Sequence, residues 1–245
     1  MMAHDRTVLR VTGAEAAPFL QDLVTNDVDR LSDGLVYAAL LTAQGKYRAD
    51  FFLVPDGDDI LIDVDAALAD GLAKALALYK LRRKVEITPT DLTVTRGTGP
   101  VPEGAFADPR DASMGWRGYA GQPGDDTDFD ARRVAALVPE SGIELTPDTF
   151  ILEAGFERLN GVDFRKGCYV GQEVTARMKH KTELRKGLAR VAVEGAAPVG
   201  TPIESDGKAA GTLFTQSGGQ AIAYLRYDRA GPAMQAGDAR VAYTP

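Results

Sequence analysis

The stretch VYAALLTAQGKYRADFFLVPDGDDILIDV, residues 36–64, contains three apolar runs at 36–42, 46–54 and 59–64. The segments AQGK and PDGDD separate these runs, and short turns rich in Gly, Asp and Pro are typical of the connections between antiparallel strands. We therefore predict two adjacent β-hairpins, in which the middle strand pairs with both of its neighbours.

The sequence on either side of the hairpins predicts helices and further strands. Residues 8–11 have the composition of a short strand, and a helix is expected from PFLQDLV at 18–24. A longer helix is expected from Asp65 to about Arg83, because its apolar residues recur at helical spacing. VEITP at 85–89 and LTVTR at 92–96 predict two more strands. Strand hairpins combined with amphipathic helices indicate an α+β layer architecture.

The last third of the chain has a different character. From Gly187 onward, short apolar stretches alternate with turns that contain Gly and Pro, including Asp206-Gly207. This spacing predicts a small antiparallel barrel or sandwich. Before it, residues 130–137 and 149–159 are compatible with helices. We place a boundary near residue 184, which gives one domain at 1–183 and a second at 184–245.

Composition excludes several classes of function. The net charge is −7, and phosphate contacts need dense Lys and Arg, so we expect no nucleic-acid partner. No apolar run approaches the roughly 20 residues that span a bilayer, and we expect no membrane association. One cysteine and two histidines argue against a catalytic zinc site and against a cluster held by this chain alone, which needs about four cysteines. The lone cysteine and the absence of a secretory signal favour the cytoplasm.

The single cysteine lies in FRKGCYVGQE, residues 164–173. Gly167 and Gly171 permit unusual backbone dihedrals on both sides of Cys168. The following QEVTARMK is compatible with a helix, so we expect the thiol in a turn just before a helix N-terminus. A helix dipole and the nearby Lys166 favour a thiolate. Two interpretations stay open, a reactive thiol and a small packed side chain in a glycine turn.

Basic residues are concentrated in two places. Six lysines and arginines occur from Arg177 to Arg190, with Glu183 as the one acid among them. The second cluster lies at residues 80–84. Each cluster is either a solvated face or a pocket for a small polyanion.

At this point the sequence resembles a known family. KGCYVGQE, followed by ARMKHKTELRKGL, resembles the signature of the YgfZ family, a folate-binding branch of the aminomethyltransferase superfamily linked to iron–sulfur protein maintenance. Residues 19–28, 40–54 and 79–87 are similar, in order, to the family's N-terminal half. The resemblance covers nearly the whole chain. It implies an α+β, aminomethyltransferase-like folate-binding region with a small C-terminal antiparallel β-barrel.

The resemblance also implies a site. Tetrahydrofolate or a derivative is the expected cofactor, and Asp50 matches the acidic residue beside the folate's reactive nitrogens. Lys166 and Cys168 match the lysine and cysteine of the motif, and with Asp50 they form the expected catalytic set. Ala135 departs from the family, because it stands where relatives often carry a glutamate that faces the pterin ring. The other expected cofactor-binding residues are Asn26, Tyr169, Gln172, Glu173 and Arg177.

Three functions are consistent with these observations. The first is a tetrahydrofolate-binding accessory protein for assembly or repair of iron–sulfur clusters, with iron–sulfur client or assembly proteins as partners and a reactive Cys168. The second is a folate-dependent aminomethyltransferase, which Asp50 favours and KGCYVGQE does not. The third is a non-catalytic folate-binding module in which Cys168 is merely packed. Whether the chain catalyses a transfer is left open at this stage.

Overall fold

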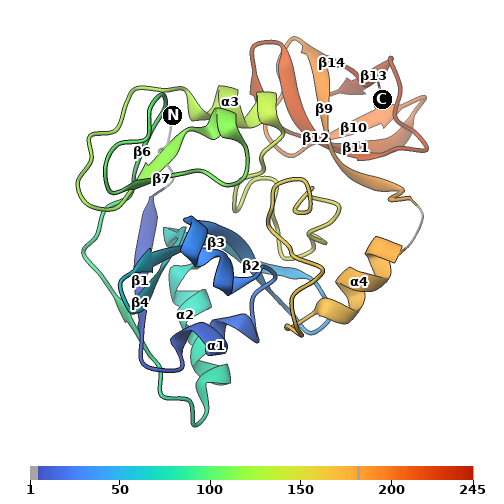
Figure 1. The fold of residues 1–245 in the computed structure, drawn as a ribbon. Helices are drawn as coiled ribbons and strands as arrows, with labels where there is room; N and C mark the ends of the chain where they lie inside the picture. Colours follow the sequence, from blue (N-terminus) through green and yellow to red (C-terminus); the bar gives the residue numbers. More distant parts are fainter. Residues whose placement is uncertain (1–4, 181–182, 245) are drawn as a thin grey trace. The chain divides into compact units, whose positions relative to one another are not determined.

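The computed structural model describes residues 5–180 and 183–244 (Figure 1). The chain divides into two compact units. The N-terminal unit contains the residues up to Thr127 together with Phe156–Ala176, and the C-terminal unit contains Asp128–Gly155 and the residues from Arg177 onward. This division differs from the predicted boundary near residue 184, because Asp128–Gly155 groups with the barrel rather than with the first domain.

A five-stranded antiparallel sheet forms the N-terminal unit, with the strand order β2-β3-β4-β1-β5. The predicted hairpins at 36–64 are confirmed, since β3 pairs with both β2 and β4. The strands are β1 (Arg6–Thr12), β2 (Val36–Leu41), β3 (Tyr47–Asp56), β4 (Asp59–Asp65) and β5 (Glu86–Pro89).

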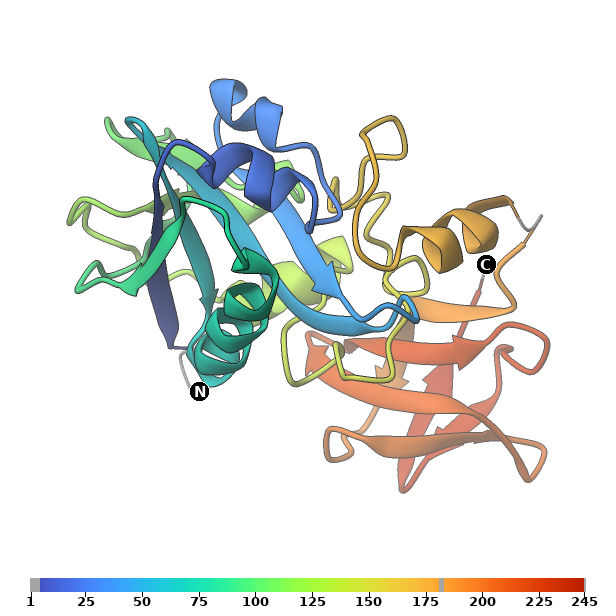
Figure 2. The ribbon, with the colours of Figure 1, turned by 90° about the horizontal axis from the view of Figure 1, so that it is seen from below.

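Helices cover one face of this sheet. α1 (Ala16–Gln21) and α2 (Ala66–Lys80) lie on the same side of the strands in Figures 1 and 2. The sheet side chains that they cover, such as Phe51 and Leu53, are fully buried in one apolar cluster. Asp65 caps α2 by accepting a hydrogen bond of 2.9 Å from Ala67 N. Burial of this apolar face is the main source of stability for the unit.

The opposite face of the sheet is polar and aromatic. Tyr37, Asp50, Phe52 and Asp63 point to this side, because successive residues of a strand alternate between faces. A small sheet contributes Arg117, whose guanidinium lies 3.9 Å from the Phe52 ring and donates to Asp63 at 2.8 Å. The three strands of the small sheet, in the order β6-β8-β7, are β6 (Thr95–Gly97), β7 (Ala105–Ala107) and β8 (Trp116–Gly118).

The C-terminal unit contains a closed barrel in the order β10-β11-β12-β9-β14-β13, which confirms the predicted barrel. The β10–β11 turn is Asp206-Gly207, with φ values of 50° and 70° that suit a tight hairpin. The barrel encloses its own apolar cluster, in which Ile203 and Leu213 are fully buried. Its strands are β9 (Lys186–Glu194), β10 (Thr201–Ser205), β11 (Lys208–Ser217), β12 (Gln220–Arg226), β13 (Met234–Ala236) and β14 (Ala239–Ala242).

Asp128–Gly155 is bound to the barrel by a buried ionic network. α3 (Phe129–Ala136) contributes Arg133, whose Nη1 donates to Glu144 at 3.1 Å. The other carboxylate oxygen of Glu144 accepts from Thr215 on β11 at 2.5 Å. These contacts explain why this segment groups with the C-terminal unit.

The predicted helix at 149–159 is wrong. Residues 151–160 form successive turns. Gly155 has φ +78°, a left-handed conformation that interrupts a right-handed helix, and Glu153 O accepts from Leu188 N at 2.7 Å instead of from a helical neighbour. The remaining helices are η1 (Val28–Asp33), η2 (Ala112–Met114) and α4 (Gln172–His180). Within the described part of the chain, no helix has the length and apolarity needed to cross a membrane.

Candidate functional site

Cys168 is exposed in the irregular segment that leads into α4. The expected position, just before a helix, is confirmed. Gly171 holds this segment against the β2–β3 turn, because its φ is +82° and an added Cβ would lie 2.6 Å from Thr42 O. A side chain at position 171 would therefore displace the cysteine segment.

Lys166 points in the opposite direction and is buried, with 8% of its surface exposed. Its Nζ donates three hydrogen bonds, to Gln21 O at 2.8 Å, Val24 O at 2.6 Å and Asn26 O at 2.9 Å. An ammonium group has three N–H donors, so none is left for a thiolate or a ligand. The predicted influence of Lys166 on a Cys168 thiolate therefore does not rest on a hydrogen bond from this ammonium, and it stays a prediction.

The charge of Lys166 lies in an unusual environment. Burial lowers the pKa of Lys166 to about 8, while Asp27, Asp22 and Asp163 oppose that shift. The ammonium also lies 5.3 Å from the centre of the Tyr169 ring. Tyr169 is itself buried, and burial raises its pKa to about 12. Lys166 and Tyr169 thus point inward on either side of the exposed Cys168.

Asn26 is buried and makes contacts within the protein through both atoms of its amide. Nδ2 donates to Tyr37 O at 2.8 Å and to Asn160 O at 2.7 Å, and Oδ1 accepts from Asp27 N at 2.8 Å. Thr25 beside it donates to Gly161 O at 2.7 Å. These two side chains join the α1–β2 connection to residues 160–161, and this role is independent of any cofactor.

Asp50 lies on β3 and is 4% exposed. Its two carboxylate oxygens accept hydrogen bonds from Tyr37 Oη at 2.9 Å and from Tyr47 Oη at 2.6 Å. Burial and the Asp50 charge raise the pKa of Tyr37 well above its ordinary value, so this tyrosine stays protonated and keeps donating. The expected buried, partnered carboxylate is confirmed. The two tyrosines are the residues that sequence reasoning missed.

This geometry is a partial fit to the expected tetrahydrofolate. The N–H groups of a pterin ring need acceptors, and Asp50 is a buried carboxylate whose two oxygens each already accept from a tyrosine hydroxyl. Ala135 is exposed on α3 and supplies no carboxylate. Folate binding stays a prediction for this chain.

The remaining candidates lie on α4. Gln172 is half-buried and its Nε2 donates to Gly167 O at 3.4 Å, whereas Glu173 and Arg177 are exposed. In the basic cluster that follows, Lys181 lies outside the described residues. Arg190 is committed to Ala135 O at 2.7 Å. The assignment of these residues to a cofactor or anion site stays a prediction.

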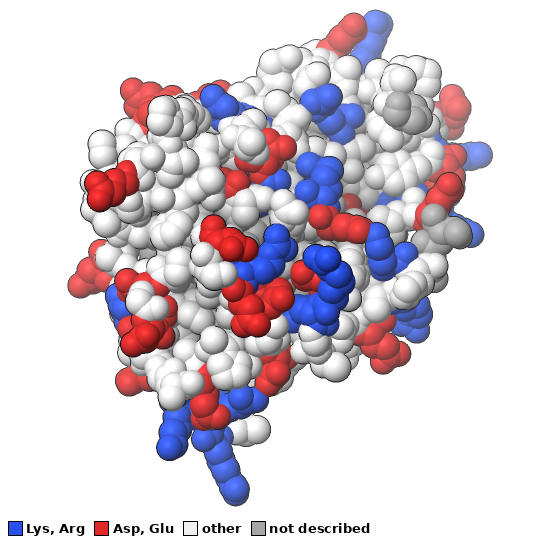
Figure 3. All heavy atoms as spheres, viewed as in Figure 1, with Lys and Arg blue, Asp and Glu red and all other residues white. Residues whose placement is uncertain are grey.

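The second basic cluster lies at the end of α2. Figure 3 shows Lys and Arg side chains at the lower edge of the molecule, where Figure 1 places this helix end. Arg83 forms an ion pair of 2.5 Å with Asp22, and Leu81 beside it is 88% exposed. The cluster is partly neutralised by this pair, and Lys80, Arg83 and Lys84 line a pocket of about 390 Å³.

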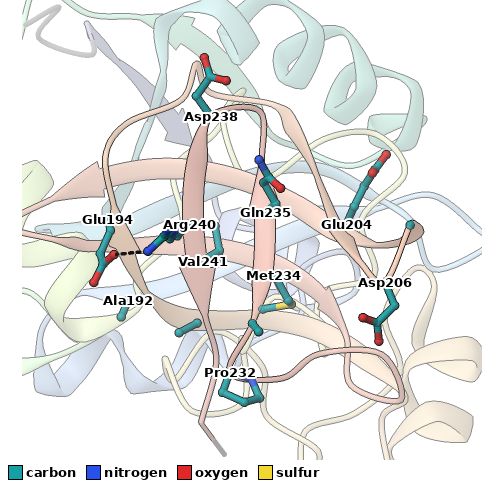
Figure 4. A pocket seen from close by; sticks show the side chains of 13 residues that line it. Ala192, Glu194, Glu204, Asp206, Pro232, Met234, Gln235, Asp238, Arg240 and Val241 are labelled. Atoms are coloured by element: carbon teal, nitrogen blue, oxygen red, sulfur yellow. Dashed lines mark ion pairs between the residues drawn. The ribbon is translucent and has the colours of Figure 1, made fainter.

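A cavity of about 950 Å³ lies on the barrel (Figure 4). Its rim is acidic, with Glu204, Asp206 and Asp238 among the lining residues. Arg240 and Glu194, which are partners on the neighbouring strands β14 and β9, form an ion pair of 3.8 Å at one side of it. None of the predicted site residues lines this cavity, so it adds nothing to the predicted site.

Comparison with known proteins identifies the family. A family model described as the CAF17 C-terminal beta-barrel domain matches residues 185–245. The mitochondrial iron–sulfur cluster assembly factor IBA57 of Mus musculus is 34% identical to this chain over 270 residues, which cover 90% of this chain and 75% of the mouse protein. This chain belongs to the IBA57 family. The human IBA57 protein is also 34% identical, over 267 residues, with the same coverage. These IBA57 relatives do not carry the name YgfZ, which the motif had suggested.

A solved structure supports the predicted fold. The crystal structure of the glycine cleavage system aminomethyltransferase T from Bartonella henselae matches 96% of this chain and 81% of its own chain, with a TM-score of 0.70. The sequence identity is 12%, so the likeness concerns the fold alone. The predicted aminomethyltransferase-like fold with a C-terminal barrel is confirmed.

Proposed function

We propose that this IBA57-family protein is an assembly factor for iron–sulfur clusters in other proteins. The names of its mouse and human relatives support the proposal. The exposure of Cys168 indicates that its thiol is the functional group. Cys168 is the single cysteine of the chain, and the residues next to it are firmly held. An exposed thiol is available to partner proteins, and its thiolate form is the reactive one. The partners are iron–sulfur client or assembly proteins.

The test is complementation of a strain that lacks the protein. We expect the wild type to restore the activities of several iron–sulfur enzymes, and Cys168→Ser to fail although it is produced and folded equally well. Arg165→Ala is the matched control, because the Arg165 side chain is 92% exposed on the same segment. Full rescue by Cys168→Ser would remove the thiol from the function, and unchanged iron–sulfur enzymes in the deletion strain would remove the function itself.

Tetrahydrofolate is the finer part of the proposal. It is favoured by the position of Asp50, a buried carboxylate on β3 in an aminomethyltransferase-like fold. Folate is a carrier of one-carbon units, and Asp50 would accept hydrogen bonds from its ring. The test is a calorimetric titration of the wild type and of Asp50→Asn with tetrahydrofolate. Equal binding heats for the two proteins would reject the placement of the folate ring at Asp50. An assay for methylene transfer from an aminomethyl donor separates binding from the alternative aminomethyltransferase activity.

The cellular location also stays open to test. The sequence favours the cytoplasm, whereas the mouse and human relatives are named as mitochondrial proteins. Fractionation of cells that produce the tagged protein would distinguish the two locations.

A further inference from the structure

All three N–H donors of the Lys166 ammonium form hydrogen bonds inside the protein. Its three hydrogen bonds, of 2.6 to 2.9 Å, all end on backbone carbonyl oxygens of the α1–β2 connection. The residues that carry these carbonyls precede Lys166 by 140 to 145 positions in the sequence. A charged donor makes stronger hydrogen bonds than a neutral one, and breaking a buried set leaves several polar groups unsatisfied. The contact therefore fixes two remote segments to each other.

We propose that Lys166 is a positioning residue, which anchors the Cys168 segment to the carbonyls of Gln21, Val24 and Asn26 and thereby fixes where the thiol is presented. The proposal deepens the proposed function, since it concerns the same cysteine, but its geometry does not depend on that function. It differs from the expectation that Lys166 favours a thiolate as a nearby charge.

The contacts around Cys168 support an anchor on both sides of the thiol. Lys166 and Tyr169 are buried, and Gly167 and Cys168 between them are exposed. Gly171 closes the segment, because its backbone packs where no Cβ fits. The backbone is thus held two residues before the cysteine and one and three residues after it. Such support limits the directions in which the thiol can point.

The chemistry of the lysine suits this role better than arginine would. An ammonium is a compact charge with three converging donors, whereas a guanidinium is planar and presents its donors in a fixed fork. Three carbonyls around one nitrogen match the ammonium. We therefore expect Lys166→Arg to keep the charge and lose the anchor, and Lys166→Met to lose both.

The single cysteine permits a direct measurement. A nitroxide spin label on Cys168 reports the local motion of the segment through its electron paramagnetic resonance spectrum. We expect a slow component in the wild type, and a shift toward fast motion, with a several-fold shorter correlation time, in both Lys166→Met and Lys166→Arg. Lys179→Met, at an exposed lysine of α4, is the control and should leave the spectrum unchanged. Wild-type mobility in a folded Lys166→Arg protein would overturn the proposal.

A second measurement separates anchoring from activation. The pH profile for alkylation of Cys168 reports the pKa of the thiol. An anchor predicts the same midpoint in the wild type and in Lys166→Met, while a charge that activates the thiol predicts a midpoint at higher pH in the variant. If Lys166→Met does not fold, the mobility measurement on Lys166→Arg is the test of the anchor. Unchanged iron–sulfur enzymes in the deletion strain would reject the proposed function and leave the mobility result intact, so the two failures are distinguishable.

Discussion

Replacing Asn26 by aspartate keeps the shape of a buried side chain and removes its two amide donors. In the wild type these donors bind Tyr37 O at 2.8 Å and Asn160 O at 2.7 Å. In the variant a carboxylate oxygen faces both carbonyls. The perturbation therefore tests whether Asn26 holds the N-terminal unit together, as the structure indicates, or serves a cofactor.

The expected cost follows from the contacts. Loss of two buried hydrogen bonds costs about 2 kcal/mol, and the carbonyls left without donors add about 1 to 3 kcal/mol. The sum of about 3 to 5 kcal/mol is a large part of the roughly 5–15 kcal/mol that stabilises a domain. Burial disfavours the charged form of the introduced carboxyl, so its pKa in the folded state exceeds the unfolded value. The folded variant then binds more protons than the unfolded one between these two pKa values, and its stability falls as pH rises through that window.

Denaturant unfolding at pH 5 and pH 7.5 measures both effects. Asn160→Asp is the matched control, because Asn160 is exposed and its amide makes one hydrogen bond, to Pro109 O at 2.9 Å. We expect a cost of about 1 kcal/mol or less for this control. A cost for Asn26→Asp no greater than that of the control, or one that shrinks as pH rises, would refute the reasoning.

Three further outcomes are expected. Gly171→Ala should destabilise the cysteine segment and lower rescue of the deletion strain, since its Cβ would lie 2.6 Å from a backbone oxygen, and normal rescue would contradict this. Tyr47→Phe should cost about 1.5–3 kcal/mol in urea unfolding, because it removes a hydrogen bond to the buried Asp50 carboxylate. If folate binds that carboxylate, the same variant should bind tetrahydrofolate more tightly in calorimetry. Burial raises the pKa values of Asp63 and Asp108, but the neighbouring arginines outweigh it and hold both below the ordinary value of an aspartate. The stability that these carboxylates contribute is therefore present above about pH 4 and is lost as pH falls further. Asp108→Asn should flatten that acid limb in unfolding measurements.

Local patterns predicted most of the fold. The three strands at 36–64 were identifiable because apolar runs and turn residues are adjacent in the sequence, and the barrel because apolar stretches there alternate with turns that contain Gly and Pro. The helix predicted at 149–159 was wrong because composition does not reveal the left-handed conformation of Gly155 or the hydrogen bond from β9 to Glu153 O.

The candidate site was less predictable. The position of Cys168 just before α4 was predictable from its glycines and from the helical composition after it, whereas its exposure required the structure. The partners of Lys166 leave no trace in the sequence, because any residue offers a carbonyl oxygen. The two tyrosine partners of Asp50 were not predictable either, because Tyr37 is 13 residues away on the neighbouring strand. Side-chain roles that depend on such pairing required the structure.

The interrupted N-terminal unit has a consequence for biosynthesis. Its second part, Phe156–Ala176, leaves the ribosome only after Asp128–Gly155. Until Gly161 and Lys166 emerge, Thr25 and the carbonyls of residues 21–26 have no such partners, and closing loops of this length slows folding. A nascent chain that stalls near residue 150 should therefore expose an N-terminal unit whose α1–β2 connection lacks these partners, although all of its strands have been made, so that quality control acts on this protein late in translation.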